Sequence, residues 1–184
     1  MDVGNLLPRC RRGLTVIELI TTLAVAGISL AVIVPSWAAL ADRSRITTAA
    51  NDLLGSLRYA RNEAVHRHTT VSVCPSTDAD TCTGEPSTWH LGYLVFLDPN
   101  RNRRRDTDEP VLRYHVAANT ALNLHSTAAR PAVRFDADGA AWGTNTTFSI
   151  CAGDSGGNRA VILHGTGRAR VDDKTGSGDP VTCT

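Results

Sequence analysis

The stretch RCRRGLTVIELITTLAVAGISLAVIVPSW, residues 9–37, decides how this chain can fold. Three arginines lie within its first four positions, and residues 19–41 carry no charge. About 20 such residues can span a bilayer as a helix, and arginines before them favour a cytoplasmic N-terminus with an exported C-terminal part. One carboxylate, Glu18, stands near the start of the apolar run. Because a carboxylate in hydrocarbon is costly, Glu18 is a candidate functional residue.

A secretory signal peptide is the alternative interpretation of this segment. Its cleavage site should follow the apolar run, and that flank contains no clear small-x-small site. The charged leader instead ends at Gly13, before the run begins.

Helical periodicity continues beyond the apolar run, and short β-rich segments follow it. Apolar residues recur at spacings of three and four, which predicts one helix over 14–66 whose second half is amphipathic and packs on a globular domain. The expected core positions are Ile46, Ala50, Leu53, Leu57, Ala60 and Ala64. Seven predicted strands, separated by Gly, Pro, Asp and Asn, lie within 69–75, 89–98, 111–116, 121–125, 132–139, 146–151 and 158–171. The pattern predicts an α+β fold with small antiparallel sheets packed on the helix.

Charge and cysteine content limit the function further. The net charge is +1, and beyond residue 13 the chain carries 16 basic and 17 acidic residues, so only local clusters can attract a polyanion. Apart from Cys10 in the leader there are four cysteines, which favour two disulfides in an oxidising compartment. Three pairings are possible, with four free thiols as the alternative, and the spacing does not match zinc sites. We expect Cys74–Cys82 and Cys151–Cys183.

The string RRGLTVIEL, residues 11–19, resembles the class III signal of type IV prepilins and type II secretion pseudopilins. Leucine in place of the usual phenylalanine after the glycine, and Val16 in place of leucine, are departures from that signal. The resemblance implies cleavage by prepilin peptidase between Gly13 and Leu14, followed by N-methylation of Leu14. It also implies that Glu18 meets the α-amino group of a neighbouring subunit during filament assembly, which offsets the cost of burying the carboxylate. The alternative is that Glu18 only extends to the membrane interface.

The stretch WHLGYLVFLDPNRN, residues 89–102, resembles the GspH/FimT/FimU group of this family, and the chain is most like FimT. The resemblance implies a pilin-like fold with a leader (1–13), a transmembrane helix half (14–41), an amphipathic half (42–68) and an exported β-rich domain (69–184). It implies a single pass through the inner membrane with a cytoplasmic N-terminus and a periplasmic domain, before entry into a pilus or pseudopilus. The expected partners are other pilins, prepilin peptidase and the membrane.

The string HGTGRARVDDK, residues 164–174, is a candidate DNA-binding element. On a strand, Arg168 and Arg170 point to one face, where two guanidinium groups suit adjacent phosphates. Gly167, Arg168 and Arg170 match the GRxR element associated with DNA binding in FimT-like members, and Lys174 is a further candidate. The expected function is a minor pilin that binds double-stranded DNA for natural transformation. The alternative is a structural pseudopilin of type II secretion, or a pilus-priming minor pilin, that binds only protein.

Two further strings resemble functional motifs, a calcium-binding loop and a serine-protease string, but the neighbouring residues do not support either function. DPNRNRRRDTDE, residues 98–109, has oxygen ligands at EF-hand positions, but Arg103 occupies the place of the required glycine. We expect a hydrogen-bonded turn there, with no metal or cofactor; a calcium site is the alternative. The arginines at 101 and 103–105 would extend a phosphate-binding stripe if they lie near Arg168. GDSGG, residues 153–157, matches a serine-protease string, but no matching histidine motif precedes it. We expect a glycine-rich turn there and no enzyme activity.

Overall fold

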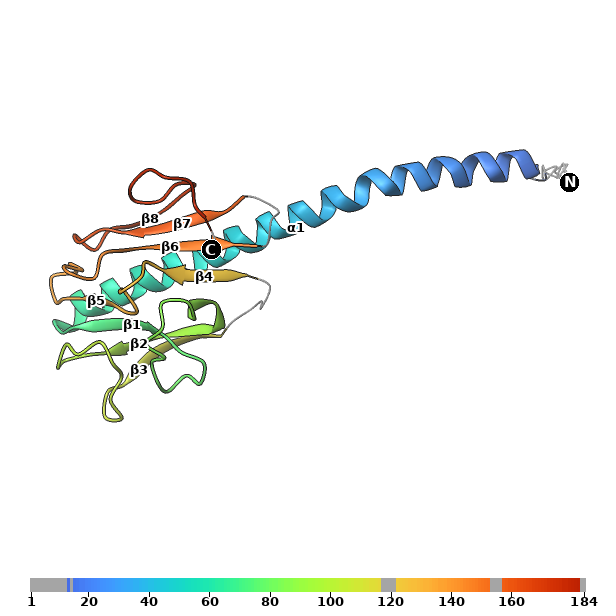
Figure 1. Ribbon diagram of the computed structural model, residues 1–184. Coiled ribbons are helices and arrows are strands. Elements are labelled where there is room, and N and C mark those ends of the chain that lie inside the picture. The colour runs from blue at the N-terminus through green and yellow to red at the C-terminus, as the bar shows by residue number, and fades with distance from the viewer. Residues whose placement is uncertain (1–12, 14, 117–121, 153–156, 183–184) are drawn as a thin grey trace, which may run out of the picture. The chain divides into compact units, whose positions relative to one another are not determined.

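The computed structural model describes residues 13, 15–116, 122–152 and 157–182, with the backbone alone at 31–36, 38 and 39. The chain divides into two compact units, Met1–Ala38 and Ala39–Thr184. Helix α1 spans Val16–Arg67, close to the predicted 14–66 (Figure 1). The sequence therefore predicted the length of this helix to within two residues at either end.

The second half of α1 packs on both sheets of the globular unit. All six predicted core positions of the helix, from Ile46 to Ala64, are completely buried. They join one hydrophobic cluster with side chains from both sheets, among them Val73 and Val161. Burial of each larger side chain, such as Leu53, stabilises the fold by about 2 kcal/mol. The predicted amphipathic face is confirmed.

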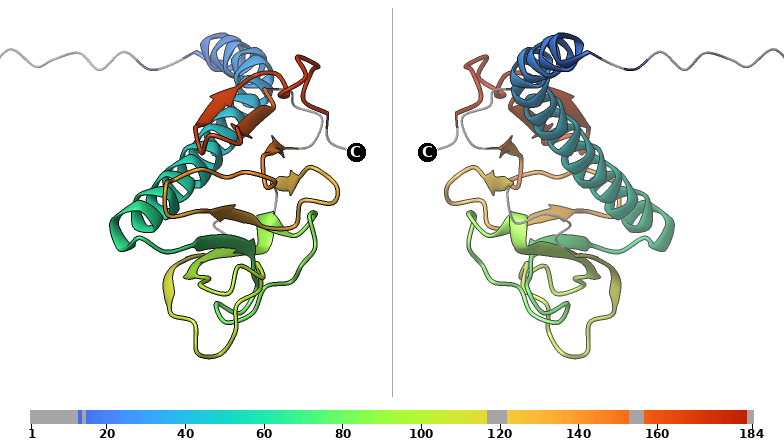
Figure 2. Two further views of the ribbon diagram at one scale, coloured as in Figure 1. Left: turned by 90° about the vertical axis from the view of Figure 1, so that its left-hand side faces the viewer. Right: turned by 90° about the vertical axis from the view of Figure 1, so that its right-hand side faces the viewer.

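Two antiparallel four-stranded sheets lie on the same side of this part of α1 (Figure 2). The first has the order β3-β2-β1-β5 and the second has the order β4-β6-β7-β8. The strands of the first sheet are β1 (Val71–Pro75), β2 (Gly92–Leu97), β3 (Val111–Val116) and β5 (Val133–Phe135). Those of the second are β4 (Asn123–Ser126), β6 (Thr146–Cys151), β7 (Arg159–Leu163) and β8 (Ala169–Asp172). The predicted α+β, pilin-like architecture is confirmed.

The single strand predicted over 158–171 is wrong, because the structure forms a hairpin there. Strands β7 and β8 pair antiparallel, with Leu163 opposite Ala169. The turn between them is closed by hydrogen bonds from the Gly167 N–H to the His164 carbonyl at 2.9 Å and from the His164 N–H to the Arg168 carbonyl at 3.0 Å. Gly167 has φ +78°, a left-handed conformation that glycine adopts without steric cost. The glycines of the string therefore end one strand and begin the next.

Trp89 joins the two sheets at the centre of the core. It lies in a short 3-10 helix, η1 (Trp89–Leu91), just before β2. Its ring meets Phe148 of β6 edge-on at a centroid distance of 4.8 Å, and its indole N–H donates to the Ser126 hydroxyl at 3.1 Å. The polar atom of this fully buried aromatic is thus satisfied, as stability requires. The tryptophan of the WHLGYLVFLDPNRN stretch is a packing residue.

Candidate functional site

The first turn of α1 carries the predicted assembly residue. Glu18 is exposed there, and its backbone N–H donates to the Thr15 hydroxyl at 3.3 Å. Thr15 thus caps the helix, in the Thr-x-x-Glu spacing of a capping box. This capping role was not predicted, although the Thr-x-x-Glu spacing in the sequence indicates it. Gly13 is exposed, and Leu14 lies outside the described residues.

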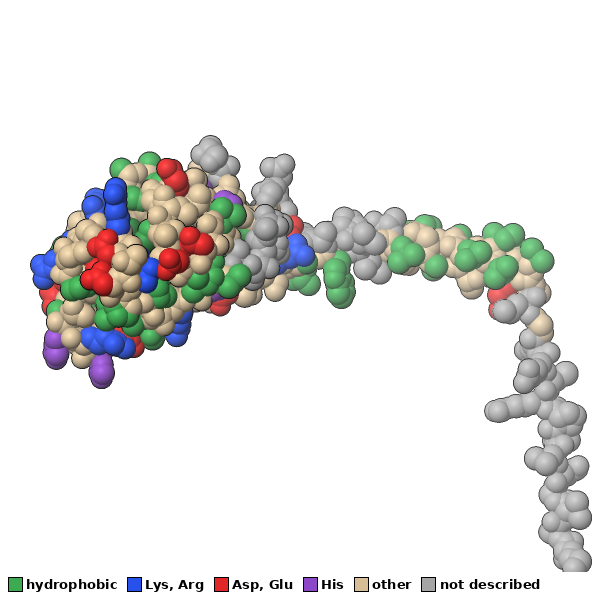
Figure 3. Space-filling model, turned by 90° about the horizontal axis from the view of Figure 1, so that it is seen from below, with side chains coloured by type: hydrophobic (Ala, Val, Ile, Leu, Met, Phe, Trp, Pro, Cys, Tyr) green, Lys and Arg blue, Asp and Glu red, His purple; other side chains and the backbone are tan. Residues whose placement is uncertain are grey.

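Apolar side chains cover the first turns of α1, on both sides of Glu18 in the sequence (Figure 3). Those of Val16, Ile17, Leu19, Ile20, Leu23, Val25, Ile28 and Leu30 are all more than half exposed within this chain. The hydroxyls of Thr21, Thr22 and Ser29 donate to carbonyls three or four residues earlier, so they do not need water. These side chains form an unpartnered apolar surface at the start of the helix.

In the part of the chain that the structure describes, no helix is both long enough and apolar enough to cross a membrane. The span predicted over 14–41 includes Leu14 and the side chains of 31–36, 38 and 39, which lie outside that part.

The disulfide predicted between Cys74 and Cys82 is confirmed, with Cα atoms 5.6 Å apart. It closes a loop after β1, in which the Asp78 carboxylate accepts backbone hydrogen bonds from Asp80 and Thr81. These bonds, the one from Thr81 first, hold the pKa of Asp78 well below its usual range. Cys151 is disulfide-bonded as well. Cys183, its predicted partner, lies outside the described residues.

The predicted DNA-binding residues lie on and beside β8, at one edge of the second sheet. Arg168 and Arg170 are exposed, while Ala169 between them is buried, as the strand alternation predicts. A guanidinium nitrogen of Arg170 lies 3.3 Å from the Asp172 carboxylate. Hydrogen bonds from Asp173 and Lys174, with the charge of Arg170, lower the pKa of Asp172. Ionised Asp172 therefore competes with any phosphate for Arg170.

The turn before Arg168 packs tightly on its neighbours. A Cβ added to Gly167 would stand 1.8 Å from the Gly139 carbonyl oxygen and 3.2 Å from Nε of Arg61. Arg61 belongs to α1, so the fold brings a helix cation to the GRxR turn. Nothing in the sequence connects Arg61 with this element, because the two lie far apart in the chain. Lys174, beyond β8, is exposed.

The loop between β2 and β3 forms the hydrogen-bonded turn predicted for 98–109. Asp98 is completely buried and accepts hydrogen bonds from the Ser72 hydroxyl at 2.5 Å and from the N–H groups of Asn102 and Arg103 at 3.0 Å. Asp106 accepts from the side-chain amides of Asn100 and Asn102 at 2.7 and 2.9 Å. The carboxylates of Asp98 and Asp106, two of the candidate calcium ligands, are thus engaged in hydrogen bonds with the protein. Among the described residues no group of three or more His, Cys, Asp or Glu is arranged to hold a metal ion.

The arginines of this loop do not extend the β8 surface into one stripe. They follow β2, whose sheet ends at β3 and β5, whereas β8 is the edge of the other sheet. The two regions lie over different sheets in Figure 1. A continuous stripe was predicted only on the condition that these arginines lie near Arg168, and the sheet order does not favour that condition, since the loop leaves the other sheet. The GDSGG string falls mainly on residues 153–156, outside the described part.

The chain resembles several known proteins. The family model described as type II transport protein GspH matches residues 49–167. Pilin-like protein PilA1 of Thermus thermophilus is 28% identical over 167 residues, which cover 88% of this chain and 99% of that protein. The crystal structure of type IV minor pilin FimU of Pseudomonas aeruginosa is 25% identical, with a TM-score of 0.57, over 74% of this chain and 96% of FimU. A second crystal form of FimU gives a TM-score of 0.55.

One N-terminal helix packed on small antiparallel sheets is the fold of a pilin-like subunit. Because the family model matches more than half of the chain, the chain belongs to the GspH family. It is a minor pilin or pseudopilin of a type IV pilus or a type II secretion system, and such subunits are structural and not enzymes. The family implies other pilins as partners and membrane anchoring before entry into the filament.

Proposed function

We propose that this chain is a type IV minor pilin whose exported domain binds double-stranded DNA through the hairpin of β7 and β8. The observation that carries the proposal is the pair Arg168 and Arg170, exposed on either side of the buried Ala169 on an edge strand. Residues two apart on a strand are about 7 Å apart, close to the spacing of successive phosphates along one DNA strand. The arrangement favours contact with the backbone and not with base edges.

The charges of the hairpin support this proposal. Arg168 has no ion-pair partner among the described residues, so its guanidinium is free to meet an anion. Arg170 forms an ion pair with Asp172, and its side chain is about half exposed. Such surface ion pairs contribute at most about 1 kcal/mol to stability. A phosphate can therefore replace Asp172 at low cost. Arg61 supplies a third cation beside the turn.

The same proposal assigns the N-terminal residues to assembly. Prepilin peptidase would cut between Gly13 and Leu14, methylation would follow at Leu14, and Glu18 would meet the new α-amino group of a neighbour. The exposed apolar side chains after Glu18 support this role, because they need either lipid or other subunits to cover them. The N-terminus would stay in the cytoplasm and the domain in the periplasm. We also propose that, within its group, this chain is most like FimT.

A structural pseudopilin that binds only protein is the second candidate function. The description of the matching family, type II transport protein GspH, favours it. In that case the arginines of β8 would serve only as a solvated strand surface. The two candidates differ in a single measurable property, which is DNA binding by the globular unit.

The test uses residues 42–184 with disulfides formed. In the described chain all buried hydrophobic residues lie between Ile46 and Val181, so this segment keeps the whole core. Fluorescence anisotropy with a labelled duplex is measured across a salt series, for the wild type and for the double variant Arg168→Ala, Arg170→Ala. We expect micromolar binding that weakens with salt, and in the variant a loss of at least about tenfold and a salt slope smaller by about 2.

A matched control removes two arginines from elsewhere on the unit. The double variant Arg43→Ala, Arg45→Ala takes the same charge from the helix, where Arg43 lies beside Gly157 at the opposite end of β7 from the turn. It should keep most of the DNA affinity. If the wild-type domain does not bind DNA at low salt, the receptor function is wrong and the structural role remains. Equal losses in both double variants would show attraction by net charge alone.

A further inference from the structure

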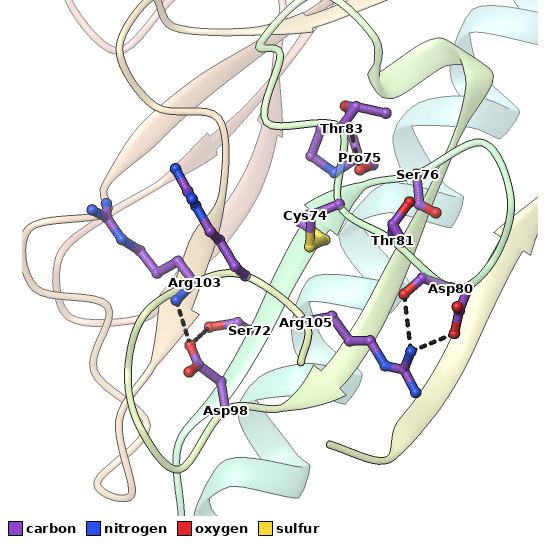
Figure 4. The surroundings of a disulfide bond; sticks show 12 residues. Ser72, Cys74, Pro75, Ser76, Asp80, Thr81, Thr83, Asp98, Arg103 and Arg105 are labelled. Atoms are coloured by element: carbon purple, nitrogen blue, oxygen red, sulfur yellow. Dashed lines mark hydrogen bonds and ion pairs between the residues drawn. A yellow bond between two sulfur atoms is a disulfide. The ribbon is translucent and has the colours of Figure 1, made fainter. Parts of the chain in front are cut away.

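A cavity of about 600 Å³ lies between the disulfide loop after β1 and the arginine loop between β2 and β3. Figure 4 shows Cys74 between these loops, with Arg105 extending toward Asp80 and the Arg103 backbone beside Asp98. Polar and cationic side chains provide much of its wall. Those that matter here are Thr81, Thr83, Asn102, Arg103, Arg104 and Arg105.

Two of the three arginines in the wall have unused hydrogen-bond donors. The guanidinium groups of Arg103 and Arg104 have neither an ion pair nor a hydrogen bond among the described residues, and both side chains reach solvent. Arg105 differs, because it donates to the Glu109 carbonyl at 3.1 Å and pairs with the Asp80 carboxylate. The side chain of Arg105 is only 13% exposed, so it fixes one loop against the other. The cavity wall thus contains one arginine held in place by its contacts, Arg105, and two whose guanidinium groups can bind a ligand, Arg103 and Arg104.

One carboxylate, Asp106, also lines the cavity. Its Oδ2 atom accepts hydrogen bonds from the amides of Asn100 and Asn102, so part of its charge is satisfied within the loop. Asp80 is paired with Arg105. Among the residues that line the cavity, three arginines thus accompany one partly neutralised carboxylate, and the lining carries a net positive charge.

The backbone of the loop holds Arg103 in an unfavourable conformation. Arg101 and Arg103 have φ +62° and +61°, in the left-handed region that is unfavourable for a residue with a Cβ. Buried Asp98 maintains this conformation by accepting the Arg103 N–H. Backbone strain that is over-determined by buried contacts is typical of binding sites, where it sets a side chain in advance. Here it directs an arginine to the cavity wall.

We infer that this cavity binds a phosphate group through Arg103 and Arg104. A guanidinium is planar and always charged, and it matches phosphate oxygens with two parallel N–H donors. The phosphate comes either from a free phosphate ion or from the backbone of a nucleic acid, since both present the same oxygens. The inference does not rest on DNA binding by β8, because it uses other residues on the other sheet.

The test measures binding of inorganic phosphate to residues 42–184 with disulfides formed. Isothermal titration and thermal unfolding are compared with chloride at equal ionic strength. We expect saturable binding and a rise in Tm with phosphate, and affinity at least about tenfold lower in the double variant Arg103→Gln, Arg104→Gln. The control Arg101→Gln removes one positive charge from the same loop, at a position outside the cavity wall. It should change the affinity less than twofold.

Two further arms separate this site from β8 and identify the source of the phosphate. The variant Arg168→Ala, Arg170→Ala should bind inorganic phosphate as the wild type does, even if its DNA binding is lost. DNA affinity is then compared between the wild-type domain and the variant Arg103→Gln, Arg104→Gln. A lower DNA affinity in that variant would assign the site to a nucleic-acid backbone. Loss of phosphate binding with unchanged DNA affinity would assign it to free phosphate. The inference is overturned if chloride reproduces the rise in Tm. It is overturned equally if the glutamine variant, shown by its unliganded Tm to be folded, binds phosphate normally.

Discussion

The β7–β8 hairpin and the loop between β2 and β3 both present arginines, but they hold them in different ways. On β8, regular alternation exposes Arg170 and buries Ala169, so the strand itself orients the cation. The 98–109 loop has no regular structure, and its arginines depend on the buried carboxylate of Asp98 and on Arg105. A strand thus displays charge through its local geometry. A loop needs contacts with residues elsewhere in the chain to hold its charged side chains in place. Substitution of those residues should therefore disturb the loop.

The largest expected effect tests the turn of the hairpin, through Gly167→Ala. The new Cβ would stand 1.8 Å from the Gly139 carbonyl oxygen, and the residue would keep φ +78°. Clash and backbone strain together should lower the free energy of unfolding by about 3–5 kcal/mol, measured by urea denaturation. The control Gly178→Ala has φ +93° but open space around its Cβ, and should cost about 1 kcal/mol. Equal losses would show that close packing does not hold the turn.

The next effect breaks the arginine loop, through Asp98→Ala. Removal of the carboxylate leaves the Ser72 hydroxyl and the N–H groups of Asn102 and Arg103 without their acceptor. We expect a loss of about 3 kcal/mol in urea denaturation, together with loss of phosphate binding but not of DNA binding through β8. Asp108→Ala, at an exposed position of the same loop, should stay within about 0.5 kcal/mol of the wild type. A loss below 1 kcal/mol for Asp98→Ala would contradict the proposed support.

Removal of the Cys74–Cys82 disulfide should also weaken the 98–109 loop, because the disulfide loop contacts it through Asp80. The bond joins residues eight positions apart, and loop-closure entropy predicts a loss of about 2.5 kcal/mol for Cys74→Ser with Cys82→Ser. The freed segment contains Asp80, the partner of Arg105. Phosphate affinity should therefore fall, and by at least as much as DNA affinity does, because Arg168 and Arg170 belong to the other sheet. Titrations of both ligands under non-reducing conditions check this, and an unchanged phosphate affinity would contradict it.

The smallest effect concerns Glu109, a buried carboxylate at the end of the loop. Burial raises its pKa above the ordinary value of 4.5, with further contributions from Asp98, Asp106 and Asp108, while the Asp106 N–H opposes the shift. The stability gained from neutral Glu109 is complete below pH 4.5 and is lost as pH rises through the raised pKa. Glu109→Gln should therefore increase stability at pH 7 by less than about 1 kcal/mol and change little below pH 4. Thermal unfolding across pH checks this, and a destabilised variant at pH 7 would oppose it.

Much of the candidate site could be predicted from the sequence, although its environment could not. The exposed positions of Arg168 and Arg170 follow from strand alternation, and the Cys74–Cys82 bond joins residues close in sequence. The approach of Arg61 to Gly167 could not be predicted, because it joins a helix to a hairpin about 100 residues away. The hairpin itself was missed because the strand pattern on both sides of the turn looks continuous.

The sequence alone predicted the helix Val16–Arg67 with its buried face, six of the eight described strands as separate elements, and the pilin-like class. These features rest on periodicity and on short motifs, which act between residues near each other in the chain. Three features follow only from the folded structure: the two arginine regions lie on different sheets, Asp98 is buried, and a cavity forms beside the disulfide. These depend on strand order and on which side chains lose water, and both are set by contacts between distant segments.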